Sequence, residues 1–81
     1  MDTLGKLFGS PARVKILRLF LLNPLDAFDV PMIATKSKVR ESDTRRELAL
    51  LKAAGIIVEK SFTKKIGKKS RRVAGYQLKG T

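Results

Sequence analysis

Apolar positions along the chain fall into three helix-like stretches followed by two strand-like ones. From residue 11 to residue 22, apolar side chains recur at helical spacing, and Ser10 followed by Pro11 is a typical helix start. Asn23-Pro24 ends this stretch, because proline cannot continue the hydrogen-bond ladder and disfavours helix at the residue before it. The pattern predicts a first helix over residues 11–22.

A shorter apolar pattern comes next. Residues 25–29 are expected to form a loop, and Val30 is expected to be extended because it precedes a proline. Pro31 then opens a short helix that ends near Ser37. Its buried side is expected to consist of three apolar residues, Met32, Ile33 and Ala34.

The third helix is predicted over residues 41–54, and it stops at Gly55, a common residue after a helix C-terminus. Its first turn has two candidate caps, Ser42 alone or Thr44 with Glu47 as a capping box. At about 100° per residue the helix divides into two faces. The inward face holds Thr44, Glu47, Leu48, Leu51 and Ala54, with Leu50 at its margin. The outward face holds Ser42, Arg45, Arg46, Ala49 and Ala53, flanked by Lys52.

The last third of the chain has the pattern of a β-hairpin. After Gly55, the β-branched run of residues 56–58 predicts a strand that reaches Phe62. Residues 63–70 are rich in lysine and glycine and are predicted to form a turn, and residues 71–78 the return strand. The expected fold class is α+β, with three helices and a C-terminal β-hairpin in a single domain over residues 1–81.

The first helix carries more apolar residues than one face can bury. Val14, Ile16, Leu17, Phe20 and Leu21 form a broad arc, but Leu19 and Leu22 fall on the side of Lys15 and Arg18. One interpretation is that an N-terminal turn folds over this second surface. The other is a homodimer contact, or docking of a C-terminal domain if the chain is part of a longer protein. The residues concerned are Leu4, Leu7, Phe8, Leu19 and Leu22.

The composition of the chain bears on which kind of partner it binds. The chain has 18 Lys and Arg against 7 Asp and Glu, no His and no Cys, and a net charge of +11. Without His or Cys there is no disulfide, no thiolate or imidazole catalyst and no usual zinc ligand set, so we expect no enzyme, metal or cofactor. Such a positive charge attracts polyanions, of which nucleic acid comes first and an anionic membrane surface second.

The pattern gives no sign of a membrane protein. The most apolar segment, residues 14–22, is broken by Lys15 and Arg18, whereas a membrane helix needs roughly twenty apolar residues. The start of the chain also lacks the charged and apolar regions of a signal peptide. We therefore expect a cytoplasmic, nucleoid-associated protein without a membrane partner.

Two groups of cations are candidates for polyanion contact. Seven basic residues and no acid lie between residues 60 and 72 of the hairpin. Such a run would also discourage edge pairing of strands, although seven exceeds that need. On the third helix, Arg45 and Arg46 are forked donors beside small residues, a suitable arrangement for guanine edges or phosphates. They would equally form surface pairs, Glu41 with Arg45 and Asp43 with Arg46.

The order of elements and several residues together resemble a known family. The stretch IATKSKVRESDTRRELALLKAAGII, residues 33–57, resembles the helix-turn-helix of winged-helix transcription regulators of the ArsR and MarR type. The resemblance rests on a small Ala34 at the helix crossing, an apolar Val39 in the turn, and an ending formed by Leu48, Leu51 and Gly55. The sequence departs from the pattern at Lys38, where glycine is common, and at Arg40, where Ser or Thr is usual. Two acids near the DNA-facing helix end, Glu41 and Asp43, are also atypical.

The resemblance implies a winged helix-turn-helix fold in which the third helix enters the DNA major groove and residues 63–72 form a basic wing on the backbone. Base contacts are then expected from Glu41, Ser42, Arg45, Arg46 and Ala49. Backbone contacts are expected from Lys36, Lys38, Arg40, Lys52, Lys60, Lys64, Lys65, Lys68, Lys69, Arg71 and Arg72.

The expected function is sequence-specific binding of double-stranded DNA by a transcription regulator. Two other classes stay open. A structural nucleic-acid protein, architectural or ribosome-associated, would use the same charge without sequence preference, and a winged helix can also serve as a protein-docking module. The charge favours a nucleic-acid partner over protein docking alone.

Overall fold

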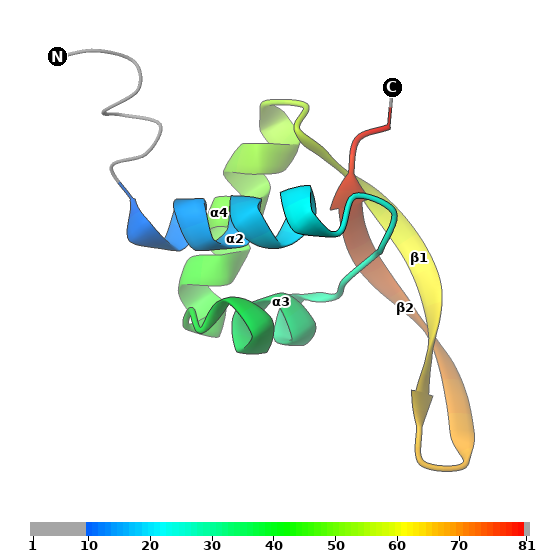
Figure 1. The fold of residues 1–81 in the computed structure, drawn as a ribbon. Coiled ribbons are helices and arrows are strands. Elements are labelled where there is room, and N and C mark those ends of the chain that lie inside the picture. The colour runs from blue at the N-terminus through cyan, green and yellow to red at the C-terminus, as the bar shows by residue number, and fades with distance from the viewer. Residues whose placement is uncertain (1–9, 81) are drawn as a thin grey trace, which may run out of the picture.

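The computed structural model describes residues 10–80, which form three helices followed by a two-stranded antiparallel hairpin (Figure 1). The helices are α2 (Pro11–Leu22), α3 (Val30–Ser37) and α4 (Glu41–Ala53), and the strands are β1 (Ile57–Ile66) and β2 (Lys69–Leu78). The predicted α+β order of elements is confirmed at this level.

Local signals set the ends of α2 where they were predicted. The Arg13 amide donates to the Ser10 hydroxyl oxygen at 3.3 Å, and Pro11 occupies the first helical position. At the other end, the Asn23 side-chain amide donates to the Leu19 carbonyl at 2.9 Å. Both ends of the helix therefore have side-chain caps from residues that disfavour helix interior positions.

Helix α3 begins one residue earlier than predicted. Val30 is helical and not extended, because Asp29 supplies the N-cap: its Oδ1 accepts from the Met32 amide at 2.9 Å. Pro31 then lies within the first turn, where its missing N–H is not needed. On the predicted inner side, Ile33 is fully buried, whereas Met32 and Ala34 are only partly buried.

The turn between α3 and α4 has unusual residues at both of its caps. Lys38 ends α3 in the left-handed conformation, with φ of 57°, and its amide donates back to the carbonyl groups of α3. Arg40 occupies the N-cap of α4 without any side-chain cap bond. Helix α4 then ends at Ala53, one residue before the predicted end, and Gly55 follows with φ of 77°.

Both predicted caps of α4 are wrong. Ser42 lies one residue inside the helix and is exposed. The Thr44 hydroxyl donates to the Arg40 carbonyl at 2.9 Å, and the Glu47 carboxylate binds Arg13 of α2. The capping box is absent because tertiary packing directs both of these side chains into the domain.

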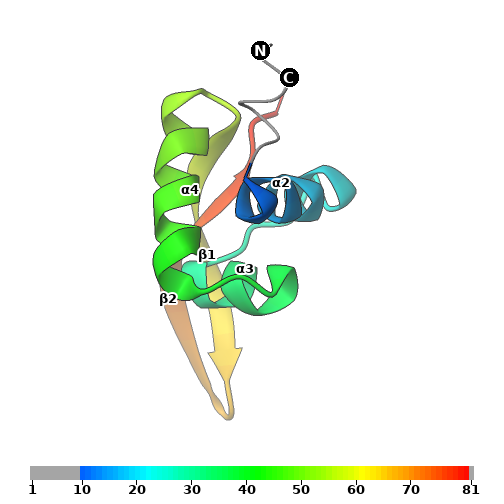
Figure 2. The ribbon, with the colours of Figure 1, turned by 90° about the vertical axis from the view of Figure 1, so that its left-hand side faces the viewer.

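The hairpin is longer than predicted, and its turn is shorter. Residues 63–70 were predicted to be a turn, but Ile66 pairs with Lys69, so only Gly67 and Lys68 connect the strands. Gly67 has φ of 64° at the first of the two loop positions, the place where type II′ turns take glycine. With this tight turn the lysine-rich flanks extend both strands, and the hairpin projects beyond the helices (Figure 2).

A short bridge joins the base of the hairpin to the loop before α3. Phe28 and Tyr76 exchange two backbone hydrogen bonds, of 2.9 and 2.8 Å. Gly75 beside this bridge is buried, because the Phe62 ring and the Phe28 carbonyl occupy the space that a side chain would take. This contact fixes the hairpin to the helical part, and the sequence pattern did not predict it.

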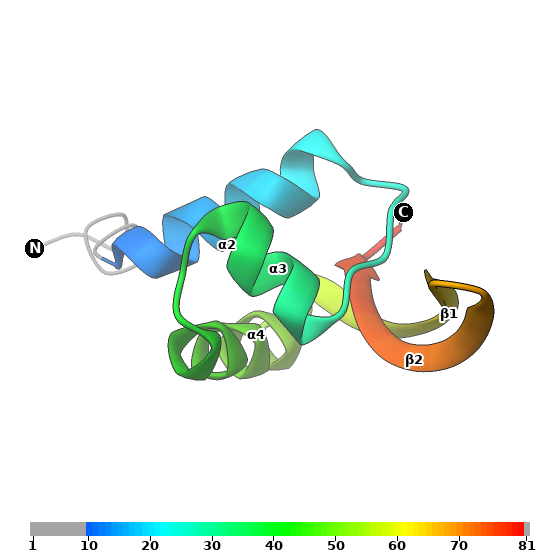
Figure 3. The same ribbon diagram turned by 90° about the horizontal axis from the view of Figure 1, so that it is seen from below.

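The core lies between the three helices and the base of the hairpin. Phe20 of α2 packs edge-on against Phe28, with ring centroids 5.9 Å apart. The view from below shows α4 and the hairpin along one side of the molecule, with α2 on the other (Figure 3). Among the described residues the buried apolar side chains are Ile16, Phe20, Phe28, Ile33, Leu48, Leu51 and Ile57.

Candidate nucleic-acid interface

Helix α4 separates into two faces almost as the sequence predicts. Its buried residues are Thr44, Glu47, Leu48 and Leu51. Ala54, predicted on the inward side, is exposed because it lies past the last helical residue, and Leu50 at the margin is 48% exposed. The predicted outward residues are all exposed: Ser42, Arg45, Arg46, Ala49, Lys52 and Ala53.

An ion pair with α2 fixes the orientation of α4. The Arg13 Nε donates to the Glu47 carboxylate at 2.7 Å, and the Glu47 side chain is only 9% exposed. Since a buried carboxylate is costly without a partner, rotation of α4 that broke this contact would be unfavourable. Together with the buried Leu48 and Leu51, the pair therefore favours the orientation in which the outward face of α4 meets solvent.

The two outward arginines form the predicted pairs along the helix. Arg45 Nη2 lies 2.8 Å from Glu41 Oε1, and Arg46 Nη1 lies 3.8 Å from Asp43 Oδ1. Exposed pairs of this kind contribute only about 0.3 to 0.5 kcal/mol, so a base edge or a phosphate can replace the carboxylate. Both guanidinium groups are mostly exposed and accessible to a ligand.

The hairpin presents most of its cations to solvent. These residues are exposed and form no ion pair with another described residue: Lys60, Lys65, Lys68, Lys69, Arg71 and Arg72. Lys64 and Arg71 face each other in the strand register, so like charges meet across the hairpin. The ion pair of Lys64 with Asp29 offsets part of this repulsion, and an anion bound at Arg71 would reduce it further.

Lys64 differs from the other hairpin cations. Its Nζ lies 2.9 Å from Oδ2 of Asp29, and the two side chains are 31% and 10% exposed. The Asp29 carboxylate thus caps α3 with one oxygen and holds β1 with the other. The structure therefore gives Lys64, predicted as a backbone contact, an intramolecular partner. The role of Asp29 was missed, although an Asp just before a helix start is a recognisable cap signal.

The remaining predicted backbone contacts lie on or beside the helices. Lys36 and Lys38 are exposed at the end of α3 and form no ion pair with another described residue. Arg40 lies 3.3 Å from Asp43, and Lys52 lies 3.2 Å from Glu59 of β1. All four side chains are accessible, and two of them would exchange a carboxylate for a phosphate on binding.

The second surface of α2 differs from the one predicted. Leu19 is partly buried and packs against the core, so less of it is exposed than the helical pattern predicts. Leu22 is 70% exposed, as that assignment requires, and it forms an apolar surface with Leu21 and Val14. The other candidate residues, Leu4, Leu7 and Phe8, lie outside the described residues.

Within the described part of the chain, no three acidic side chains come together as a group that could hold a metal ion. Within residues 10–80, no helix is both long enough and apolar enough to cross a membrane. The exposed chemistry consists mainly of cations on α4, the hairpin and the turn before α4.

Comparisons with protein-family models, curated proteins and solved structures gave no match for this chain. The functional assignment therefore depends on the geometry and charge of its own residues.

Proposed function

We propose that this chain is a winged-helix domain that binds double-stranded DNA as a transcription regulator. In this proposal α4 enters the major groove, and the hairpin is the wing that follows the phosphate backbone. The order of three helices and an antiparallel hairpin is compatible with this layout.

The single observation that carries the proposal is the set of cations without carboxylate partners on the projecting hairpin. Five of them, Lys65, Lys68, Lys69, Arg71 and Arg72, lie at or near its tip and form no ion pair within residues 10–80. The repulsion among them destabilises the free protein unless an anion is bound. A polyanion such as the DNA backbone would neutralise these cations.

The outward face of α4 adds a means of reading bases. Arg45 lies between Ser42 and Ala49, which are small enough to allow close approach to the groove floor. Helix α4 and the hairpin lie on the same side of the molecule, so one duplex can contact both (Figure 3). This supports sequence-specific binding over contact through the hairpin alone.

A second candidate is non-specific binding of nucleic acid by an architectural or ribosome-associated protein. It is favoured by the pairing of Arg45 with Glu41 and of Arg46 with Asp43, which occupies both arginines within α4. In that case the hairpin would supply most of the binding energy, and no sequence would be preferred.

The test is a titration of the protein with a selected duplex pool, random duplex DNA and random duplex RNA at several salt concentrations. If about 4 to 7 cations meet phosphates, log K should fall against log salt with a slope of about −4 to −6. Preference for particular duplex sequences supports the regulator, and equal affinity for all three supports the structural alternative. A slope near zero contradicts both.

A further inference from the structure

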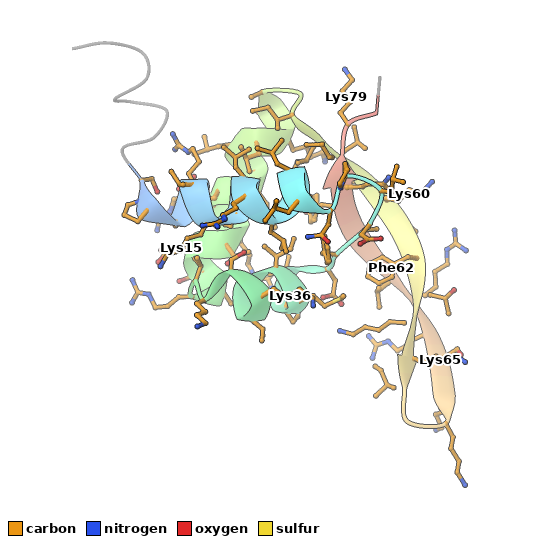
Figure 4. The ribbon with its side chains drawn as sticks, in the orientation of Figure 1. Lys15, Lys36, Lys60, Phe62, Lys65 and Lys79 are labelled. Carbon is orange, nitrogen blue, oxygen red and sulfur yellow. The ribbon has the colours of Figure 1, made fainter. Side chains whose placement is uncertain are left out.

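A hollow lies where the start of α2 meets the turn between α3 and α4. Four of the side chains that line it are cations: Lys15 of α2, Lys38 and Arg40 of the turn, and Arg46 of α4. Two acids, Asp43 and Glu47, complete the charged lining. Lys15 lies far from Lys65 of the hairpin, so the hollow is a group of cations separate from those of the hairpin (Figure 4).

Both acids of the hollow already have cationic partners. Glu47 binds Arg13, whose Nε lies 2.7 Å away, and Asp43 lies between Arg40 and Arg46, at 3.3 and 3.8 Å. Lys15 and Lys38 form no ion pair with any residue of the described part. The lining therefore keeps an excess of positive charge.

Asp43 forms ion pairs with both arginines without using up their donors. It engages only Nε of Arg40 and Nη1 of Arg46, and a guanidinium group has five N–H donors. The remaining donors of both arginines are available to oxygen atoms of a ligand. A pair of forked donors suits phosphate, which accepts several hydrogen bonds at once.

The backbone conformation of Lys38 places its side chain beside the hollow. Its φ of 57° lies in the left-handed region, where glycine would remove the steric strain of a side chain. Here a charged side chain occupies that position, beside the hollow. A single left-handed residue is a common way for a helix to end, and here it brings a lysine to the edge of the hollow.

We propose that this hollow binds one phosphate of the DNA backbone, with Lys15 and Lys38 as point charges and Arg40 and Arg46 as forked donors. The inference rests on the proposed function. Arg46 then contacts phosphate and does not read a base. Arg45, which does not line the hollow, is left to contact base edges.

The exposure of the donors favours a phosphate that belongs to a duplex. Arg40 and Arg46 are 84% and 73% exposed, so they would not enclose a small free anion. A phosphodiester needs access only from outside, and contacts elsewhere on the same duplex, at α4 and the hairpin, add to its affinity. An inorganic phosphate has no such additional contacts.

The first experiment compares Lys15→Gln with Lys79→Gln in duplex titrations over a range of salt concentrations. Lys79 is also exposed and without an ion pair in the described part, but it does not line the hollow. Lys15→Gln should weaken binding by roughly 5- to 10-fold at 0.1 M salt and flatten the salt slope by about 0.9. Lys79→Gln should leave the salt slope unchanged.

A second variant separates binding from folding. Lys38→Gly removes both the strain and the charge, so it should raise the melting temperature of the protein and still weaken duplex binding. A merely structural role for Lys38 would not combine these two changes. A melting temperature that rises while duplex affinity stays unchanged would overturn the assignment of Lys38.

The outcomes distinguish this inference from the proposed function. If the wild-type protein binds the duplex with a steep salt slope and Lys15→Gln behaves like Lys79→Gln, the phosphate hollow is overturned and DNA binding stands. If the wild-type protein shows no salt-dependent duplex binding, both fail. If inorganic phosphate binds the wild-type protein but not Lys15→Gln, and millimolar phosphate leaves duplex affinity unchanged at constant ionic strength, the hollow takes free phosphate, and its assignment to the DNA backbone is overturned.

Discussion

At the scale of single residues, spacing along one helix predicts contacts well and contacts across the fold poorly. The pairs of Glu41 with Arg45 and of Asp43 with Arg46 follow from helical geometry alone, and both are present. The pair of Asp29 with Lys64 joins residues 35 positions apart, so no local pattern contains it. Glu47 was expected to cap α4, but it pairs with Arg13 of α2. These two residues are also far apart in the sequence, so no local pattern contains their contact.

Gly75 gives a test of packing at this scale. A methyl group at this position would overlap the Phe62 ring and lie 2.9 Å from the Phe28 carbonyl oxygen. Since that oxygen accepts the bridge hydrogen bond from Tyr76, Gly75→Ala should shift or break the bridge. We expect a loss of about 1 to 3 kcal/mol in the free energy of unfolding, measured by chemical denaturation.

Gly80→Ala is the matched control, because no atom lies within 4 Å of the added methyl group. It should leave the unfolding free energy unchanged. If Gly75→Ala is as stable as this control, the packing of Phe62 over Gly75 does not hold the hairpin to the helices.

At the scale of elements, end signals in the sequence located the helices to within one residue. Ser10-Pro11 and Asn23-Pro24 bound α2 as predicted, and Gly55 follows α4 closely. The hairpin was less predictable, because its outer half has no apolar alternation. Lysine and glycine in residues 63–70 indicated a turn, while the backbone pairing of two exposed strands produced a longer hairpin.

The contact between Asp29 and Lys64 is the element-scale test, since it links the start of α3 to β1. Lys64→Gln removes the partner of a carboxylate that is only 10% exposed. It should lower the free energy of unfolding by about 1 to 2 kcal/mol, because Oδ2 of a largely buried carboxylate loses its cationic partner. Asp29→Asn preserves the cap, so the double variant should be more stable than the sum of the two single losses predicts.

Lys65→Gln is the control, because Lys65 is exposed and forms no ion pair within residues 10–80. Its unfolding free energy should match that of the wild type. Strict additivity of Asp29→Asn and Lys64→Gln would mean that the two side chains do not interact in solution.

At the scale of the whole molecule, the charge of +11 indicated a polyanion partner before any fold was known. The sequence also predicted which residues of α4 face outward, because helical periodicity is local. It did not bring Lys15 to the same hollow as Arg40 and Arg46, since that depends on how α2 packs beside the turn. For the same reason, the sequence pattern predicted Lys64 as a contact to the DNA backbone without its ion pair. The partner, Asp29, lies in a distant loop.

The last prediction separates positioning on the duplex from the reading of its sequence. Lys68 and Lys69 lie at the hairpin tip as point charges, which suit phosphate and carry little sequence information. The double variant Lys68→Gln with Lys69→Gln should weaken binding to preferred and random duplexes alike, and flatten the salt slope by about one unit per lost contact.

Arg45→Ala should behave differently, because Arg45 projects from a rigid helix between small residues. It should cost about 1 to 3 kcal/mol on the preferred duplex and much less on random DNA, since only the preferred site offers a bidentate base contact. Loss of its pair with Glu41 changes folding stability by only about 0.3 to 0.5 kcal/mol, so the folded fraction stays constant across the titrations. Equal losses on both duplexes would show that Arg45 touches only phosphate, and recognition would then depend on the hairpin, as the non-specific alternative requires.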